Sequence, residues 1–251
     1  WRSSTHFIGG LGVIVFLLLV IPDSSPFRLK MTNLELSSLS REGYRYRSSR
    51  TVWIICLVYL SLAIVETILL WVSGMSLFDA VNHSFSTIAT GGFSTKNTSI
   101  AYFDSRIIEG IVIFFMVISG MHFGMIFHFA TTGSFKVFKN PVVRFYLGTI
   151  AVMTLLVAFG LLFEGATKSV GNALWTSLFH VVSFITTTGF AIGNPYLWPI
   201  FPSVMLIYCG IQCGCSGSTS GGIKSDRVLI ALKAAGCEIR RRLHPNSVFS
   251  V

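Results

Sequence analysis

Charged side chains are scarce in this sequence of 251 residues. Lys and Arg together number 19, and Asp and Glu number only 10, so charged residues make up 12% of the chain. Hydrophobic residues make up 52%, and the mean hydropathy is +0.70. A soluble domain carries about a quarter charged residues, so this composition excludes one. We predict an integral membrane protein of the all-α class.

Cysteines are also few, and none suggests an extracellular disulfide framework. All of them fall in or beside apolar runs, where we interpret them as small buried hydrophobic side chains. A metal site at Cys213 and Cys215 is the alternative. The five cysteines are Cys56, Cys209, Cys213, Cys215 and Cys237.

The sequence contains several long apolar runs. A helix needs roughly 20 residues to cross the hydrocarbon core of a bilayer. The first run contains three glycines and is followed by no small-residue cleavage pattern, so it is not a cleaved signal peptide. No initiator Met precedes it, and we expect the chain to be an internal fragment of a longer protein. The runs are 5–22, 51–73, 107–130, 143–163 and 200–213, with an apolar continuation at 228–237.

The net charge of +9 reflects membrane topology and not nucleic-acid binding. Basic residues gather in the segments 23–50, 136–144 and 240–242, which would all lie on one side of the membrane. Cytoplasmic loops carry an excess of Lys and Arg, so we place these segments inside the cell. The chain is expected to cross this membrane several times.

One stretch of the chain occurs twice, 97 residues apart, with six identities in register. Each copy lies between long apolar runs. A helix over 77–89 would reach only about 20 Å at 1.5 Å per residue, which is too short to cross, so each copy is predicted to enter the membrane and turn back. His83, Ser86, Ile88, Thr90, Gly92 and Phe93 recur as His180, Ser183, Ile185, Thr187, Gly189 and Phe190.

The duplication divides the chain into units. Residues 51–142 form one predicted repeat of helix, short helix, loop and helix, and residues 143–251 form another. Residues 1–22 are predicted to be the closing helix of a preceding repeat, and residues 23–50 a basic cytoplasmic loop.

The repeated loops have the chemistry of a cation filter. A cation that sheds its water needs a ring of oxygens, which backbone carbonyls supply, and glycine permits the left-handed backbone that such a loop requires. The C-terminal end of each short helix, negative in its dipole, would point to the membrane centre. Neither loop contains a carboxylate. The alternative is that the loops are only helix breaks in a packed core. The predicted filter residues are Thr90, Gly91, Gly92, Phe93, Thr187, Thr188, Gly189 and Phe190.

These residues carry a family resemblance. The loop Ala89-Thr-Gly-Gly-Phe-Ser-Thr95, the loop Thr186-Thr-Thr-Gly-Phe190 and the run Gly217-Ser-Thr-Ser-Gly-Gly-Ile-Lys224 resemble the Trk/Ktr/HKT superfamily of potassium transporters, specifically its bacterial Trk membrane subunits. The resemblance implies four repeats around one pore, a selectivity glycine in each filter, and an intramembrane gate in the third repeat. Gly92 then matches the second filter glycine and Gly189 the third, so the filters span 90–95 and 186–191.

The resemblance also implies partners and a substrate. It implies a homodimer and a cytosolic nucleotide-binding ring on the inner face, where basic loops could equally contact anionic lipid headgroups. No cofactor is expected in this chain, and potassium is the transported ion, with sodium possible. Channel-like flow and ion-coupled symport both stay open.

Residues 214–222 interrupt the last apolar region with glycine, serine, threonine and cysteine. Each glycine costs a helix up to about 1 kcal/mol, so we interpret this segment as an intramembrane gating loop. A cationic side chain beside it would raise the barrier to a cation. An ordinary helix end with basic residues toward the cytoplasm is the alternative. The predicted gating residues are Gly217, Ser218, Thr219, Ser220, Gly221, Gly222, Lys224 and Arg227.

Other polar groups leave competing interpretations. Glu66 is an intramembrane carboxylate, which is a functional candidate by default but lies near the end of its helix. His83 and His180 are interpreted as packing or hydrogen-bonding residues. The segment 214–217 resembles the nucleophile motif of rhomboid proteases, with His180 as the conceivable base, but an enzyme leaves the duplicated loops unexplained. A non-conducting scaffold subunit is the remaining alternative, because this chain holds only two of four filter loops.

Overall fold

The computed structural model describes residues 1–20, 48–133 and 138–243. This part of the chain is helical apart from two strands of two residues, which confirms the prediction of an all-α protein. Residues 23–47 of the predicted cytoplasmic loop 23–50 lie outside the described residues. The last three residues of that loop belong to the start of α3. The elements are α1 (Arg2–Val20), α3 (Ser48–Val72), α4 (Leu77–Ile88), α5 (Arg106–Ser119), α6 (Phe123–Thr132), α7 (Pro141–Phe163), α8 (Val170–Ile185), α9 (Ile200–Ile211), β1 (Gln212–Cys213), β2 (Ile223–Lys224) and α10 (Ser225–Leu243), with 3-10 turns at Ser99–Phe103 and Pro195–Leu197.

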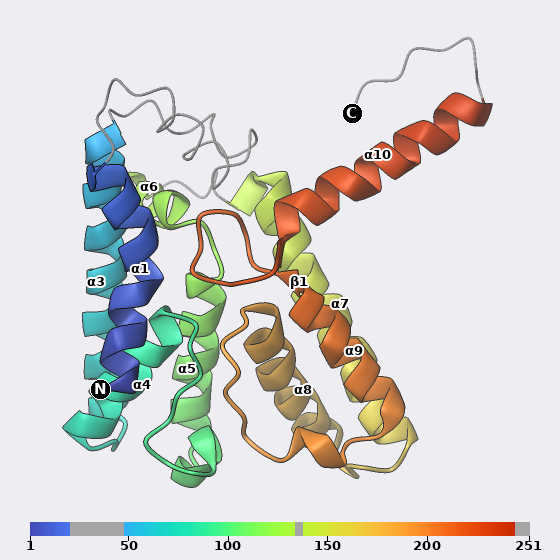
Figure 1. Cartoon of the computed structure of the whole chain (residues 1–251). Coiled ribbons are helices and arrows are strands. Elements are labelled where there is room, and N and C mark those ends of the chain that lie inside the picture. The colour runs from blue at the N-terminus through green and yellow to red at the C-terminus, as the bar shows by residue number, and fades with distance from the viewer. Residues whose placement is uncertain (21–47, 134–137, 244–251) are drawn as a thin grey trace.

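The helices form two similar units side by side (Figure 1). In one unit α3 packs on the short helix α4, and α5 follows; in the other α7 packs on the short helix α8 and on α9. Helix α1 covers α3 and α4, and α5 contacts α8 where the units meet. The two short helices therefore lie on either side of a shared central region.

Two helices of the described part are long and apolar enough to cross a membrane by themselves. These are the segments Trp53–Val72 and Pro141–Phe163. Their lipid-facing side chains stay uncovered: Trp53, Ile68 and Phe159 are all more than half exposed. Exposed apolar side chains in such numbers are tolerated when the solvent is lipid.

The short helices begin and end where their sequences dictate. The Ser76 hydroxyl caps α4 by accepting from the Asp79 amide at 3.1 Å, and Asp79 lies in the first turn, where its charge suits the positive end of the helix dipole. The helix α8 has 16 residues, or about 24 Å. Both helices end just before a threonine with left-handed backbone, at Thr90 and Thr187.

The apolar run 107–130, expected to be one straight span, is broken in the structure. Helix α5 ends at Ser119, α6 starts at Phe123, and the two are bent by 105°. The break is stabilised from the other unit, because the Gly120 carbonyl accepts from the Cys215 amide at 2.8 Å and the Phe123 amide donates to the Gly217 carbonyl at 3.3 Å. Backbone groups freed by a bend must find such partners inside a membrane protein.

The last helical region is also divided. Strands β1 and β2 pair in parallel, Gln212 with Ile223 and Cys213 with Lys224, and so close the base of the loop 214–222. Figure 1 shows this loop lying between the two units, while α10 projects away from the bundle. The apolar continuation at 228–237 is therefore not the second arm of one span.

Candidate functional site

The two repeated loops have the same backbone conformation. Thr90 and Thr187 have φ of 53° and 56°, and two residues later Gly92 and Gly189 have φ of 69° and 85°. In each loop the threonine and the glycine thus have a left-handed backbone, and the residue between them does not. Such alternation turns successive carbonyls the same way, as a row of cation ligands requires.

The left-handed threonines are stabilised locally. Each hydroxyl donates to the carbonyl of the preceding residue at 2.7 Å, Thr90 to Ala89 and Thr187 to Thr186. A β-branched residue rarely adopts positive φ, and strained backbone of this kind concentrates at functional sites. The left-handed threonine recurs at the equivalent position of both loops, which argues that this backbone conformation has a function in each loop.

Gly92 marks the closest approach of the two loops. A Cβ atom built on Gly92 would collide with the carbonyl oxygen of Thr188 in the other loop. A Cβ on Gly189 would meet nothing within 4 Å. The two glycines therefore differ: Gly92 is required by a neighbouring backbone and by its φ, whereas Gly189 is required by its φ alone.

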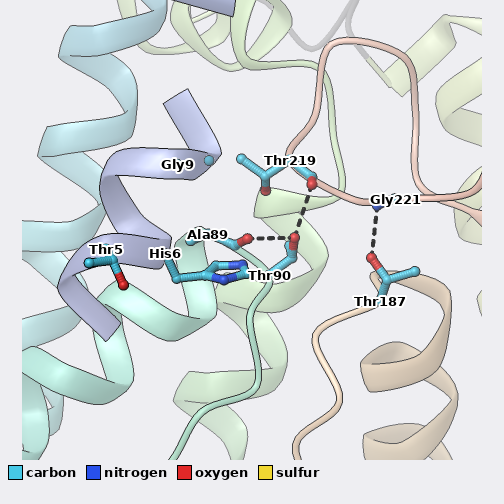
Figure 2. A pocket seen from close by; sticks show the side chains of 9 residues that line it. Thr5, His6, Gly9, Ala89, Thr90, Thr187, Thr219 and Gly221 are labelled. Carbon is cyan, nitrogen blue, oxygen red and sulfur yellow. Dashed lines mark hydrogen bonds between the residues drawn. The ribbon is translucent and has the colours of Figure 1, made fainter. Parts of the chain in front are cut away.

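The loop 214–222 is hydrogen-bonded to both repeated loops (Figure 2). The Thr219 hydroxyl donates to the Ile88 carbonyl at 2.9 Å, and the Thr90 hydroxyl donates to the Thr219 carbonyl at 3.1 Å. On the other side the Gly221 amide donates to the Thr187 hydroxyl at 2.9 Å. The loop therefore bridges the two threonines directly.

A cavity of about 500 Å³ lies where these groups meet. Thr90, Thr187, Thr219 and Gly221 all line it, and α1 contributes the remaining wall. Figure 2 shows the four labelled residues around this space, with the loop 214–222 on one side and the repeated loops on the other. The structure thus gathers predicted filter residues and predicted gating residues at one hollow.

A second cavity of about 930 Å³ lies against the other side of the second repeated loop. Gly189 and Phe190 line it, together with Asn97 and Ser99 from the first unit. Thr187 faces the first cavity and Gly189 the second, so this short loop separates two spaces.

The remaining predicted filter residues lie close by but line neither cavity. Phe93 packs against the His6 ring at 5.4 Å and lies 5.0 Å below the Arg2 guanidinium. A Cβ on Gly91 would collide with the ring of His6. The Thr188 hydroxyl lies 2.8 Å from that of Thr186 and is buried.

The predicted gating residues are ordered by bonds within their own loop. The hydroxyls of Ser218 and Ser220 lie 2.8 Å apart, and the Lys224 ammonium donates to the carbonyls of both residues. Gly217 and Gly222 have left-handed backbones, with φ of 75° and 80°. Lys224 therefore points back at the loop, and its charge meets carbonyl oxygens.

The predicted gating residue Arg227 and the serine of the rhomboid-like motif, Ser216, both lie near the start of α10. Arg227 is exposed in the first turn of α10. The Ser216 hydroxyl donates to the buried carboxylate of Asp226 at 2.9 Å. The Nδ1 atom of His180, the conceivable base, lies 2.8 Å from the Thr176 carbonyl oxygen. The serine of the rhomboid-like motif is thus engaged by a carboxylate and not by His180.

Thr5 and His6 of α1 were missed by the sequence analysis. Both line the first cavity, and Figure 2 shows the His6 side chain beside Thr90. The available signal was an ionisable side chain at the start of an apolar run, which is a functional candidate in a membrane protein.

The candidate metal ligands do not gather. No group of three or more His, Cys, Asp or Glu that could hold a metal ion occurs in residues 1–20, 48–133 and 138–243. The thiol of Cys213 donates to the Gly210 carbonyl at 3.3 Å, and Cys215 is buried. Both cysteines therefore pack as parts of the base of the loop 214–222.

Glu66 is fully buried on α3, and neither of its carboxylate oxygens has a hydrogen-bond partner within the described ranges. The Thr87 side chain of α4 lies beside it, but the Thr87 hydroxyl already donates to the His83 carbonyl at 2.8 Å. An unpaired buried carboxylate is costly in its charged form. Glu66 lines neither of the two cavities.

Asp79 lies in the first turn of α4, at the opposite end of this helix from the point where the first repeated loop begins. Burial would raise the pKa of its carboxyl, but hydrogen bonds from Thr95 and Ser76 and the nearby Lys96 ammonium outweigh this and lower the pKa below its ordinary 3.8. The Lys96 ammonium lies 3.6 Å from the Asp79 carboxylate and 4.7 Å from the Tyr102 ring. The positive charge of Lys96 beside the loop is thus paired.

Two loops with left-handed threonines face a common cavity between the units of an apolar helical bundle, which is the arrangement expected of a membrane protein of the cation transport class. The comparison of families agrees: the family of cation transport proteins of the TrkH type matches residues 1–251, and this chain belongs to that family. That family is not one of enzymes, so the protease interpretation is wrong.

Individual relatives are similar over the whole chain. The chain is 35% identical to the Trk system potassium uptake protein TrkH of Salmonella typhimurium and to that of Escherichia coli K12, covering 100% of this chain and 52% of each relative. The crystal structure of the potassium transporter TrkH from Vibrio parahaemolyticus superposes with a TM-score of 0.82 at 34% identity, over 100% of this chain and 51% of that one. The chain thus spans about half the length of the relatives it matches.

Proposed function

We propose that this chain forms the second and third quarters of the pore of a potassium uptake protein in the bacterial plasma membrane. The observation that carries the proposal is the shared cavity: Thr90 and Thr187 of the two repeated loops meet Thr219 and Gly221 of the loop 214–222 around one space. The relatives named as potassium uptake proteins support the choice of ion.

The filter would work through backbone oxygens. Carbonyls of residues 90–93 and 187–190 would replace part of the hydration shell of the ion, and the left-handed backbone at alternate positions supports this role. The C-terminal ends of α4 and α8 point at the same region and would stabilise a cation through their dipoles.

The loop 214–222 would be the gate. In the conformation described it is tied to both repeated loops, so an ion leaving the filter would have to displace it. Because the Lys224 ammonium holds the loop carbonyls, this charge would act by keeping the loop closed and by repelling a cation that approaches.

Orientation and partners complete the proposal. The repeated loops would open to the outside, with the basic segments in the cytoplasm. The basic end of α10, at Arg240, Arg241 and Arg242, would offer a surface for anionic lipid headgroups or for a cytosolic nucleotide-binding ring, and the pore protein would be a homodimer.

Potassium uptake by the full-length protein that contains this sequence tests the proposal. The protein would be expressed in a bacterial strain without its own potassium uptake systems, and net potassium uptake would be measured with and without competing sodium. Restored uptake that exceeds that of the empty vector supports the proposal. A protein present in the membrane in normal amounts that moves neither ion would instead be a scaffold subunit.

A further inference from the structure

The chain segment that follows Gly92 is hydrogen-bonded to α4 at three successive residues. The Phe93 amide donates to the Ser86 hydroxyl at 2.6 Å, the Ser94 hydroxyl lies 2.8 Å from His83 Nε2, and the Thr95 hydroxyl donates to the Asp79 carboxylate at 2.5 Å. We call these three contacts the clamp. The clamp holds the backbone of the first filter loop against α4.

The clamp depends on helical spacing. Asp79, His83 and Ser86 are separated by four and three residues, so they share one face of α4. All three are buried, and Asp79 is 7% exposed. The face of α4 that carries them therefore points at the loop along its length.

The proton positions in the clamp follow from its partners. His83 Nδ1 lies 2.7 Å from the Asp79 carbonyl oxygen, which can only accept, so Nδ1 carries a proton. In the neutral ring Nε2 is then the acceptor, and the Ser94 hydroxyl donates to it. The Lys96 amide in turn donates to the Ser94 hydroxyl oxygen at 3.0 Å, so the hydroxyl of Ser94 is used in both roles.

The second unit keeps two of the three helix residues of the clamp, with Thr176 in the place of Asp79, and lacks the loop side. His180 is placed like His83, with Nδ1 on the Thr176 carbonyl at 2.8 Å, and Ser183 donates to the Phe190 carbonyl at 2.7 Å. Ala191 and Ile192 stand where Ser94 and Thr95 stand in the first unit, and they have no hydroxyl. His180 Nε2 is accordingly buried without a hydrogen-bond partner among the described residues.

The second loop is held by its own helix at Ser183 and, in addition, from the first unit. The Ala101 amide donates to the Ala191 carbonyl, and the Ala191 amide donates to the Ser99 hydroxyl, each at 3.3 Å. Ser99 and Ala101 follow the clamped segment by only a few residues. The residues after Phe93 are thus held by α4, whereas Ala191, after Phe190, is held by a segment that continues from the first loop.

We propose that the clamp residues Asp79, His83, Ser86, Ser94 and Thr95 are positioning residues for ion selectivity. The clamp fixes the position of the first filter loop. The contacts of Ser99 and Ala101 with Ala191 then set the position of the second loop relative to the first. Discrimination between potassium and sodium depends on how well the filter oxygens are held, whether by cavity size or by their number. This proposal rests on the proposed function, since it concerns the ions that the filter would pass.

Conservative variants in the full-length protein test the clamp. Ser94→Ala and Thr95→Val each remove a hydroxyl with little change in volume, whereas Ser94→Thr and Thr95→Ser keep one. Ser105→Ala is the matched control, because Ser105 lies in the same outer segment and its side chain makes no capping hydrogen bond to α5. The readout is the ratio of potassium to sodium uptake, with the KM for potassium and the maximal rate determined separately, at equal amounts of protein in the membrane.

We expect Ser94→Ala and Thr95→Val to lower the ratio of potassium to sodium uptake by at least about threefold, a modest effect for one lost hydrogen bond. The hydroxyl-retaining variants and Ser105→Ala should keep the wild-type ratio. Wild-type ratios in Ser94→Ala and Thr95→Val would overturn the clamp. If the wild-type protein itself moved neither ion, the proposed function would fail, which is a different outcome from a conducting protein with unchanged selectivity.

Discussion

Thr90 and Thr219 are hydrogen-bonded to each other's segments in both directions, although 129 residues separate them in sequence. The Thr90 hydroxyl donates to the Thr219 carbonyl, and the Thr219 hydroxyl donates to the Ile88 carbonyl at the end of α4. The loop 214–222 and the first filter loop therefore form one hydrogen-bonded unit. If the loop 214–222 opens as proposed, these bonds must break, so their strength would contribute to the stability of the closed state.

Thr219→Val should favour the open state. Valine keeps the shape of threonine but cannot donate to the Ile88 carbonyl, and a typical hydrogen bond contributes about 0.5–1.5 kcal/mol. If the closed state loses that amount, the ratio of open to closed protein rises by roughly two- to tenfold. Basal potassium uptake per transporter should rise, and Thr219→Ser, which keeps the hydroxyl, should leave it unchanged. Uptake by Thr219→Val at or below the wild-type rate would contradict this expectation.

Gly92→Ala and Gly189→Ala should differ in severity. Both place a side chain at positive φ, which costs roughly 1 kcal/mol or more, but only the Cβ at Gly92 collides with the backbone of the opposite loop. We expect Gly92→Ala to abolish potassium uptake and Gly189→Ala to retain a measurable part of it. Thermal melting of the purified proteins would separate lost transport from lost folding. Equal loss in the two variants would show that the contact between Gly92 and Thr188 does not matter.

Lys224→Met should loosen the loop 214–222. The ammonium donates to the carbonyls of Ser218 and Ser220, and hydrogen bonds to charged groups contribute about 1.5–3 kcal/mol. The variant should increase basal uptake at least as much as Thr219→Val does, because it also removes a positive charge near the ion path. Lys224→Arg keeps the charge and should stay close to wild type. Reduced uptake in a correctly inserted Lys224→Met protein would argue against a closing role.

Asp79 should contribute stability over the whole physiological pH range. Its pKa in the folded protein is below the ordinary 3.8, so the stabilisation is present above that value and is lost only as the pH falls through the folded pKa. The thermal melting temperature of the wild type should therefore exceed that of Asp79→Asn by the same margin from neutral pH down to about pH 5. Lys96 and His83 face the carboxylate, and both side chains are retained in Asp79→Asn. A margin that already vanishes by about pH 6 would contradict the lowered pKa.

Parts of the fold could be read directly from local patterns. The short helix expected at 77–89 is α4, from Leu77 to Ile88, because a serine cap precedes it and Thr90 leaves the helical conformation after it. The run 143–163 is the helix Pro141–Phe163, capped by Asn140 with proline at its first position. In both cases the start and stop signals lie within a few residues of the helix itself.

Other parts could not be read in this way. The bend between α5 and α6 occurs in an apolar run that is continuous in sequence, and it is stabilised by the backbones of Cys215 and Gly217, nearly a hundred residues later. His6 faces the first cavity because α1 packs on α4, a contact that no local pattern encodes.

The sequence by itself determined that the chain is a helical membrane protein with two equivalent loops, each after a short helix, because burial in lipid and helix length depend on composition and spacing alone. It also pointed to the residues of both loops and of the segment 214–222. Only the tertiary structure decided how these segments meet: that Thr219 bonds to the first loop and Gly221 to the second, and that the first loop is held along α4 whereas the second is held both by α8 and from its neighbour. Such contacts depend on distances between residues far apart in sequence, which packing sets.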